Sequence, residues 1–259
     1  MNNLSQVSRK VRKEVIEMIY QAGSGHPGGS LSSTDILVGL YFGGVMGEED
    51  KFVLSAGHIC PAWYSTINLK FKIENLKLAS LREVGSSLQG HPYKKFASFV
   101  ETSTGSLGQG VSVGVGLALG KKMKKEKGRI WVLSSDGEQE EGQIWEAAMF
   151  ASKQKLNNLC LIIDRNRMQI GGETEKITAL EPLAQKYFSF GWKVLEIDGH
   201  NFDQIITAFK RAKENQEKPL AIIAKTIRGK GISFMEKQER YHACTLTEEE
   251  YEKAMEELK

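Results

Sequence analysis

The sequence is poor in cysteine and has little net charge, and each shortage excludes a class of protein. Its 259 residues include 3 cysteines, Cys60, Cys160 and Cys244, without the spacing of metal ligands. An odd, scattered set argues against a disulfide scaffold and predicts a reducing compartment, the cytoplasm. Lysine and arginine total 35, and aspartate and glutamate total 32, so the net charge is +3. This excess is too small to predict nucleic-acid binding.

Long apolar runs, linkers and targeting signals are also lacking. No run of about 18 apolar residues is present, which predicts no membrane-spanning helix and no membrane partner. Residues 1–5 lack the basic-then-apolar pattern of a signal peptide. With 41% hydrophobic and 26% charged residues, the composition is that of a globular protein. Because no proline-rich linker or repeat interrupts residues 1–259, we expect a single domain over this range.

Strand-like apolar segments alternate with stretches of helical periodicity along the chain. Strands are expected at 52–54, 130–133, 159–164, 193–198 and 220–224. Helices are expected over 7–21, 33–41, 63–70, 105–120, 140–154, 179–188 and 202–213, with a short charged helical tail at 247–259. Continuous apolar strands separated by helices indicate a parallel sheet that is covered on both faces. Because crossovers are right-handed, the predicted fold class is α/β, a doubly wound, mostly parallel sheet with helices on both faces.

Glycine is abundant, at 26 residues, and four of the five histidines directly follow a glycine. These four are His26, His58, His91 and His200. Any one of them alone is most simply a turn residue or a core histidine. Together they predict imidazoles that stand on loops beside strand or helix ends. Imidazoles in such places suit proton transfer and hydrogen bonds to phosphate or hydroxyl oxygens.

Two glycine-rich loops, at 24–30 and 104–110, precede expected helices. The free N–H groups of a helix N-terminus attract anions, diphosphates among them. The glycines within 108–114 superficially resemble a dinucleotide-binding fingerprint. No acidic residue follows about 20 positions later, and the strand–helix context is poor, so nicotinamide binding is the weaker alternative.

A pair of oxygen-bearing residues follows two expected strands. Asp136-Gly137 ends one strand, and Asn166 lies just beyond the end of the next. One strand–helix–strand unit of a parallel sheet brings these strand ends side by side. Asp-Gly alone is more often a turn. The pair at this spacing, completed by a backbone carbonyl, predicts an oxygen-only site that suits Mg²⁺ or Ca²⁺ rather than zinc.

The residues around this pair resemble a known family. Ser135-Asp136-Gly137-Glu138, followed by Glu141-Gly142 and Asn166, resembles the thiamine diphosphate motif Gly-Asp-Gly…Asn. Four further segments look like transketolase, in order and at suitable intervals: SGHPGG (24–29), LSAGH (54–58), ETSTGSLGQG (101–110) and KTIRGKGISFME (225–236). The resemblance covers essentially the whole chain and corresponds to the N-terminal, diphosphate-binding part of that family.

The resemblance implies a role for each matching position. Mg²⁺, with Ca²⁺ or Mn²⁺ as substitutes, would be ligated by the side chains of Asp136 and Asn166 and the carbonyl of Met168. Thiamine diphosphate would contact His58, Gly105, Ser106, Leu107, Gly137, Ile170 and His242. The substrate would face His26, His91 and His242. Glu141 resembles an acidic residue that communicates across the subunit interface.

Three positions depart from the family pattern. Ser135 replaces the first glycine of the motif, Ser106 stands where a proline is usual, and His242 lies in Tyr-His-Ala-Cys rather than Trp-His-Gly. None of these changes removes an expected ligand.

The resemblance implies the N-terminal subunit of a split transketolase, a transferase of carbohydrate metabolism that is associated with the pentose phosphate pathway. Such an enzyme passes a two-carbon ketol unit from a ketose phosphate to an aldose phosphate. The pyrimidine-binding and C-terminal domains are absent from residues 1–259 and are expected on a partner chain, in an α2β2 assembly. Three alternatives stay open: the α chain of an oxo-acid dehydrogenase, a deoxyxylulose-phosphate synthase, and a cofactor-binding or regulatory protein without chemistry of its own. The Gly-His loops argue against the first two, since a hydroxyl-rich substrate needs those donors.

Overall fold

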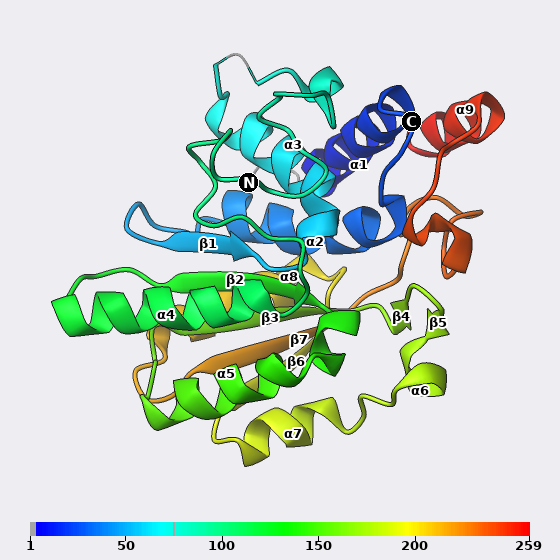
Figure 1. The fold of residues 1–259 in the computed structure, drawn as a ribbon. Helices are drawn as coiled ribbons and strands as arrows, with labels where there is room; N and C mark the ends of the chain where they lie inside the picture. The colour runs from blue at the N-terminus through cyan, green and yellow to red at the C-terminus, as the bar shows by residue number, and fades with distance from the viewer. Residues whose placement is uncertain (1–3, 75) are drawn as a thin grey trace.

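The computed structural model describes residues 4–74 and 76–259, and Figure 1 shows their arrangement. Five parallel strands form the sheet in the order β1-β2-β3-β7-β6. Their bounds are Lys51–Leu54 (β1), Ile130–Ser135 (β2), Leu159–Arg165 (β3), Lys193–Asp198 (β6) and Leu220–Lys225 (β7). Each lies where the sequence predicts a strand. The apolar runs of β1, β2, β3 and β7 are largely buried, whereas the edge strand β6 is mostly exposed or half-buried.

Helices cover both faces of the sheet (Figure 1). One layer holds α1 (Leu4–Gln21), α2 (Pro27–Phe42), α3 (Cys60–Phe71), α8 (Phe202–Glu214) and α9 (Glu248–Glu257). The other holds α4 (Gln109–Lys124), α5 (Gly142–Lys153) and α7 (Leu183–Ser189). Successive side chains of a strand point to opposite faces of the sheet, so each strand contributes to a hydrophobic core on either face. In β2, Trp131 and Leu133 pack against the first helix layer, and Ile130 and Val132 pack against the second. The predicted α/β fold is thereby confirmed.

The largest boundary error falls at α2. The sequence predicts a helix over 33–41, whereas the helix begins at Pro27. The glycines at 28 and 29 have low helix propensity, but Pro27 suits the first turn and the whole segment is buried. Ser32 and Ser33 lie inside the helix, and their hydroxyls donate to the carboxylate of Asp164 at 2.6 and 2.8 Å. Tertiary contacts therefore override the local preference.

A short antiparallel hairpin after β3 was not expected from the sequence. It joins β4 (Met168–Gln169) to β5 (Gly172–Glu173), and the short helix α6 (Thr174–Ile177) follows it. Two-residue strands carry too little periodicity to be read from sequence. The hairpin places Met168 beside the end of β3, at the carboxyl edge of the sheet where the strands β1, β2, β3 and β7 all end.

Candidate active site

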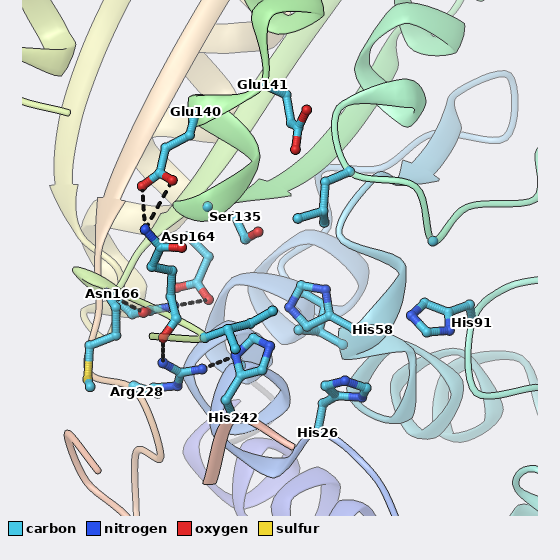
Figure 2. Close-up of a pocket in the computed structure, with 18 residues that line it drawn as sticks. His26, His58, His91, Ser135, Glu140, Glu141, Asp164, Asn166, Arg228 and His242 are labelled. Atoms are coloured by element: carbon cyan, nitrogen blue, oxygen red, sulfur yellow. Dashed lines mark hydrogen bonds between the residues drawn. The ribbon is translucent and has the colours of Figure 1, made fainter. Parts of the chain in front are cut away.

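A cavity of about 260 Å³ opens at this edge, and Figure 2 shows its walls. Histidines form one side, and carboxylate and amide side chains form the other. The predicted site residues that line the cavity are His26, His58, His91, Gly105, Leu107, Gly137, Asn166, Met168, Ile170 and His242. Two predicted residues do not line it: Asp136 is fully buried, and Ser106 is exposed on the glycine loop. Glu141 also lies on the cavity wall.

The histidine wall draws on four separate segments of the chain. His26 immediately precedes α2, His58 follows β1, His91 lies on the loop before α4, and His242 ends a short 3₁₀ helix at Glu239–His242. The His26 ring is central: its centroid lies 5.4 Å from that of His58, 5.9 Å from His91 and 5.5 Å from His242. The four imidazoles therefore face one common volume.

These imidazoles are held neutral. Burial, reinforced by neighbouring histidines and arginines, lowers the pKa of His26 to about 3. Burial and Arg228 lower the pKa of His242 to about 4. The pKa values of His58 and His91 are also lowered, mainly by burial. A neutral imidazole has one N–H donor and one acceptor, so this wall can bind hydroxyl and carbonyl oxygens without a net charge.

The fifth histidine, His200, lies outside the cavity. Its Nδ1 is 2.7 Å from a carboxylate oxygen of Asp35, and its Nε2 accepts from the backbone N–H of Ile227 at 2.9 Å. Arg12 donates to the same carboxylate. Both ring nitrogens are occupied, so His200 has the structural role that is the ordinary interpretation of a single Gly-His pair.

The opposite wall is built on the ends of β2 and β3, whose residues Ser135 and Asp164 are paired. One oxygen of the buried Asp136 carboxylate accepts from Arg165 at 3.0 Å and from the backbone N–H of Arg167. The other oxygen, Oδ1, is buried without a hydrogen-bond partner. Burial raises the pKa of Asp136 to about 7, although the Arg165 guanidinium opposes the change. A buried carboxylate oxygen without a hydrogen-bond partner destabilises the fold unless a bound ion or ligand contacts it.

Asn166 follows the end of β3, the strand that pairs with β2. Its Oδ1 accepts from the backbone N–H of Met168 at 3.0 Å, and its Nδ2 donates to Asp164 at 3.2 Å. The oxygens of this wall are hard ligands, and with the free Oδ1 of Asp136 they fit a hard divalent cation. Across residues 4–74 and 76–259, no group of three or more His, Cys, Asp or Glu could hold a metal by itself. A cation here would need oxygens from water or a ligand to complete its coordination.

Asp164 is a site residue that the sequence analysis did not single out. It is fully buried on the cavity wall and accepts from Ser32, Ser33, Asn166 and Thr226. The serines are 131 and 132 positions away in the sequence, so no local pattern could reveal them. The available signal was the polar run at the end of β3. Asp164 fixes α2, and with it the loop of His26, to the strand ends.

Glu138 is a second residue whose role was missed. Its buried carboxylate accepts from the Ser55 hydroxyl at 2.5 Å, the Gly108 N–H at 2.8 Å and the Ser135 N–H at 3.0 Å. Burial raises the pKa of Glu138 to about 7. One side chain thereby joins the end of β1, the glycine loop and the Asp-Gly turn. The motif that contains Glu138 was visible in the sequence, but its three partners were not.

Arg228 is the third residue whose role was missed. It is 2% exposed, donates to the Gln169 carbonyl at 3.0 Å, and bonds Nδ1 of His242. Burial lowers the pKa of Arg228 to about 10, which leaves it charged at neutral pH. Its Nε is buried without a partner. A buried cation on the cavity wall suits an anionic ligand.

The glycine loop supplies backbone rather than side chains. Gly105 has φ of 146°, in the region that side chains rarely adopt, and a Cβ added there would lie 3.3 Å from the His91 ring. Glycine at this position thus lets the loop pass close to His91 along the cavity. Ile170, 70% exposed, projects from the hairpin on the other side.

The sequence matches one protein family, "Transketolase, thiamine diphosphate binding domain", over residues 4–259. It is 41% identical to an apulose-4-phosphate transketolase subunit of Phocaeicola vulgatus over 100% of this chain and 94% of that protein. It is 43% identical to the 6-deoxy-6-sulfo-D-fructose transketolase subunit SqwG of Clostridium sp., over 99% of this chain and 96% of that protein. The crystal structure of Campylobacter jejuni transketolase matches with a TM-score of 0.92 at 32% identity, over 100% of this chain and 43% of that one. None of the helices in the described residues is long and apolar enough to span a membrane.

Proposed function

The chain belongs to the transketolase family through its thiamine diphosphate-binding domain, and we propose that it is the N-terminal subunit of a two-chain transketolase. With its partner it would transfer a two-carbon ketol unit from a ketose phosphate to an aldose phosphate. The observation that carries the proposal is the cavity itself. Four neutral histidines face a wall of carboxylate and amide side chains and a buried arginine. The histidines and the arginine supply the hydrogen-bond donors that a hydroxyl-rich substrate and a neighbouring diphosphate need.

We assign the cofactor to the strand-end wall. Asp136, Asn166 and the carbonyl of Met168 would hold Mg²⁺, with Ca²⁺ or Mn²⁺ as substitutes, and the ion would bind the diphosphate. The unpartnered Oδ1 of Asp136 supports this assignment. The N–H of Gly137 and the imidazoles of His58 and His242 would bind the diphosphate oxygens. When bound, thiamine diphosphate supplies the carbanion stabilisation that carbon–carbon bond exchange needs.

The remaining predicted residues enclose the rest of the cofactor and the sugar. Gly105, Ser106 and Leu107 would line the bend and the pyrimidine, and Ile170 would cover the thiazolium face. His26, His91 and His242 would hold substrate hydroxyl and carbonyl oxygens, and move protons at those oxygens during transfer. The central position of the His26 ring supports its place against the substrate.

We infer that residues 1–259 form one diphosphate-binding domain and that a partner chain carries the pyrimidine-binding and C-terminal domains. Two relatives of matching length carry "subunit" in their names, whereas the chain spans 43% of the Campylobacter transketolase. Glu141, on the cavity wall, would face the partner in an α2β2 assembly. The cysteines, two buried and none bridged, suit a reducing cytoplasm.

Co-expression with the C-terminal part of a split transketolase, followed by a ketol-transfer assay, tests the proposal. The donor panel should include xylulose 5-phosphate, apulose 4-phosphate and 6-deoxy-6-sulfofructose, because the two relatives are named for different sugars. We expect transfer from at least one donor, dependent on thiamine diphosphate and lost with EDTA. Decarboxylation of a 2-oxo acid without ketol transfer would support the dehydrogenase alternative. Cofactor binding with neither reaction would support a binding protein without chemistry of its own.

A further inference from the structure

Arg82 lies just outside the cavity, on the loop that leads to His91, and contacts the central histidine. Its Nη2 is 3.4 Å from Nδ1 of His26, and its Nη1 donates to the Ser24 hydroxyl at 3.3 Å. The side chain is half-buried and is absent from the cavity lining. Arg82 therefore contacts His26 without itself lining the cavity.

The loop is folded so that this contact is held. Arg82 has φ of 67°, and its N–H donates to the Leu88 carbonyl at 2.8 Å, which closes a turn before Gly90. A Cβ added at Gly90 would lie 2.9 Å from Nε of Arg82. The guanidinium thus packs against the backbone directly before His91 while its far end reaches His26. One side chain links the segments that carry two of the cavity histidines.

The chemistry of this contact decides which ring nitrogen carries the proton. A guanidinium has only donors and stays protonated in proteins. The nitrogen that faces it must present a lone pair, so Nδ1 of His26 is the acceptor. A neutral imidazole has a single N–H, which must then be on Nε2.

We propose that Arg82 is a positioning residue that fixes His26 in its Nε2–H tautomer and makes it an obligate hydrogen-bond donor toward the substrate. The proposal rests on the function proposed above for His26. It gives a residue outside the cavity a defined effect on the reaction. A donor at this position would bind a carbonyl or hydroxyl oxygen of the sugar and would reject a group that itself only donates.

The charges around His26 act in the same direction. The groups that face it are His58, His91, His242 and the two arginines Arg82 and Arg228. After burial, the charge of Arg82 is also among the causes that lower the pKa of both His26 and His91. No carboxylate is among these neighbours, so nothing there favours a protonated ring.

Long-range ¹H–¹⁵N spectra of the full chain, labelled at its histidine rings, test the proposal without any assay of activity. His26→Asn would assign the His26 signals. We expect His26 to be the Nε2–H form from pH 5 to pH 8, and Arg82→Met to bring in the Nδ1–H form. Arg82→Lys should keep the Nε2–H form, because an ammonium group also only donates. A wild-type Nδ1–H form, or an unchanged tautomer in Arg82→Met, would overturn the proposal.

The two-chain enzyme gives the second readout. Arg82→Met should lower kcat/KM about tenfold, the loss expected for one misdirected hydrogen bond, and leave the thiamine diphosphate Kd unchanged. Arg211→Gln, an exposed arginine on α8, is the matched control and should change neither. A kcat/KM unchanged in Arg82→Met would contradict the proposed role. If the wild-type complex transfers no ketol unit while the spectra show the Arg82-dependent tautomer, the proposed function fails and the tautomer assignment stands.

Discussion

The two walls of the cavity are built in opposite ways. The strand-end wall consists of charged or amide side chains in a dense set of hydrogen bonds, with the Asp164 carboxylate alone accepting from four side chains. The histidine wall consists of neutral rings from four distant segments, which face one another at 5.4–5.9 Å. A rigid, polar wall suits an ion and a diphosphate. A wall of neutral rings suits the oxygens of a substrate that must enter, react and leave, and two of its members, His58 and His242, are also assigned to the diphosphate.

The largest expected effect separates the two roles assigned within the histidine wall, substrate binding and diphosphate binding. His91→Ala should slow ketol transfer by the two-chain enzyme roughly 10²–10⁴-fold, as expected for a lost proton-transfer group, and leave thiamine diphosphate affinity nearly intact. His58→Ala, on the same wall but assigned to the diphosphate, is the matched variant and should do the reverse. Steady-state kinetics and calorimetry measure the two quantities. Equal losses of cofactor affinity in both variants would contradict this division of roles within the histidine wall.

The next effect tests the strand-end wall alone. Asp136→Asn keeps the shape of the side chain but removes the negative charge of the expected metal ligand. We expect thiamine diphosphate affinity in the presence of Mg²⁺ to fall tenfold or more, about 1.4 kcal/mol for each tenfold step. Titration calorimetry of the isolated chain, with and without EDTA, is the measurement. Affinity that is insensitive to both EDTA and the substitution would exclude a metal at this wall.

Glu138→Gln tests whether the Glu138 side chain holds together the segments that carry the two walls. The buried carboxylate accepts from Ser55, Gly108 and Ser135, and an amide NH₂ would face at least one of these donors. An unsatisfied buried pair costs about 1–3 kcal/mol, so the free energy of unfolding in urea should fall by that amount. Glu140→Gln, near the surface and bonded only to Gln169, is the control and should change it little. Equal stability of the two variants would refute a joining role for Glu138.

The smallest effect is a pH dependence of stability. The four cavity histidines, His26, His58, His91 and His242, titrate near pH 6.5 when unfolded and at lower pH when folded, so the unfolded state binds more protons below pH 6.5. The stabilisation that comes from keeping these histidines neutral is therefore fully present above pH 6.5, and the free energy of unfolding decreases as the pH falls toward 4. These histidines should therefore make thermal unfolding occur a few degrees lower at pH 5 than at pH 7. The raised pKa values of Asp136 and Glu138 act in the opposite direction, so the histidine effect is measured by comparison with the double variant His26→Asn, His242→Asn. If the difference in unfolding temperature between pH 5 and pH 7 is unchanged in the double variant His26→Asn, His242→Asn, groups other than these histidines cause the pH dependence.

The same contrast decides how much the sequence could predict. Apolar runs located all five strands of the sheet, and strand–helix–strand spacing predicted that the ends of β2 and β3, which precede Asp136 and Asn166, lie side by side. Both follow from local pattern and sheet topology. Of the histidine wall, the Gly-His pairs indicated loops, but they included His200, which is structural. His242 entered only through resemblance, since no local pattern marks it.

What the sequence did not predict depends on contacts between distant segments. Asp164 acquires its role from Ser32 and Ser33, and these lie on a helix whose start at Pro27 is set by burial rather than propensity. Arg228 acquires its role from the Gln169 carbonyl on a hairpin too short to be recognised. Such contacts require the tertiary structure.

A crystal structure of this chain with its partner subunit, thiamine diphosphate and Mg²⁺ would test the account most directly. We expect the metal on Asp136, Asn166 and the Met168 carbonyl, and the diphosphate between Gly137 and the imidazoles of His58 and His242. His26 and His91 should face the open space beyond the cofactor. A diphosphate bound elsewhere, or a metal without Asp136 and Asn166 among its ligands, would contradict the assignment of the two walls.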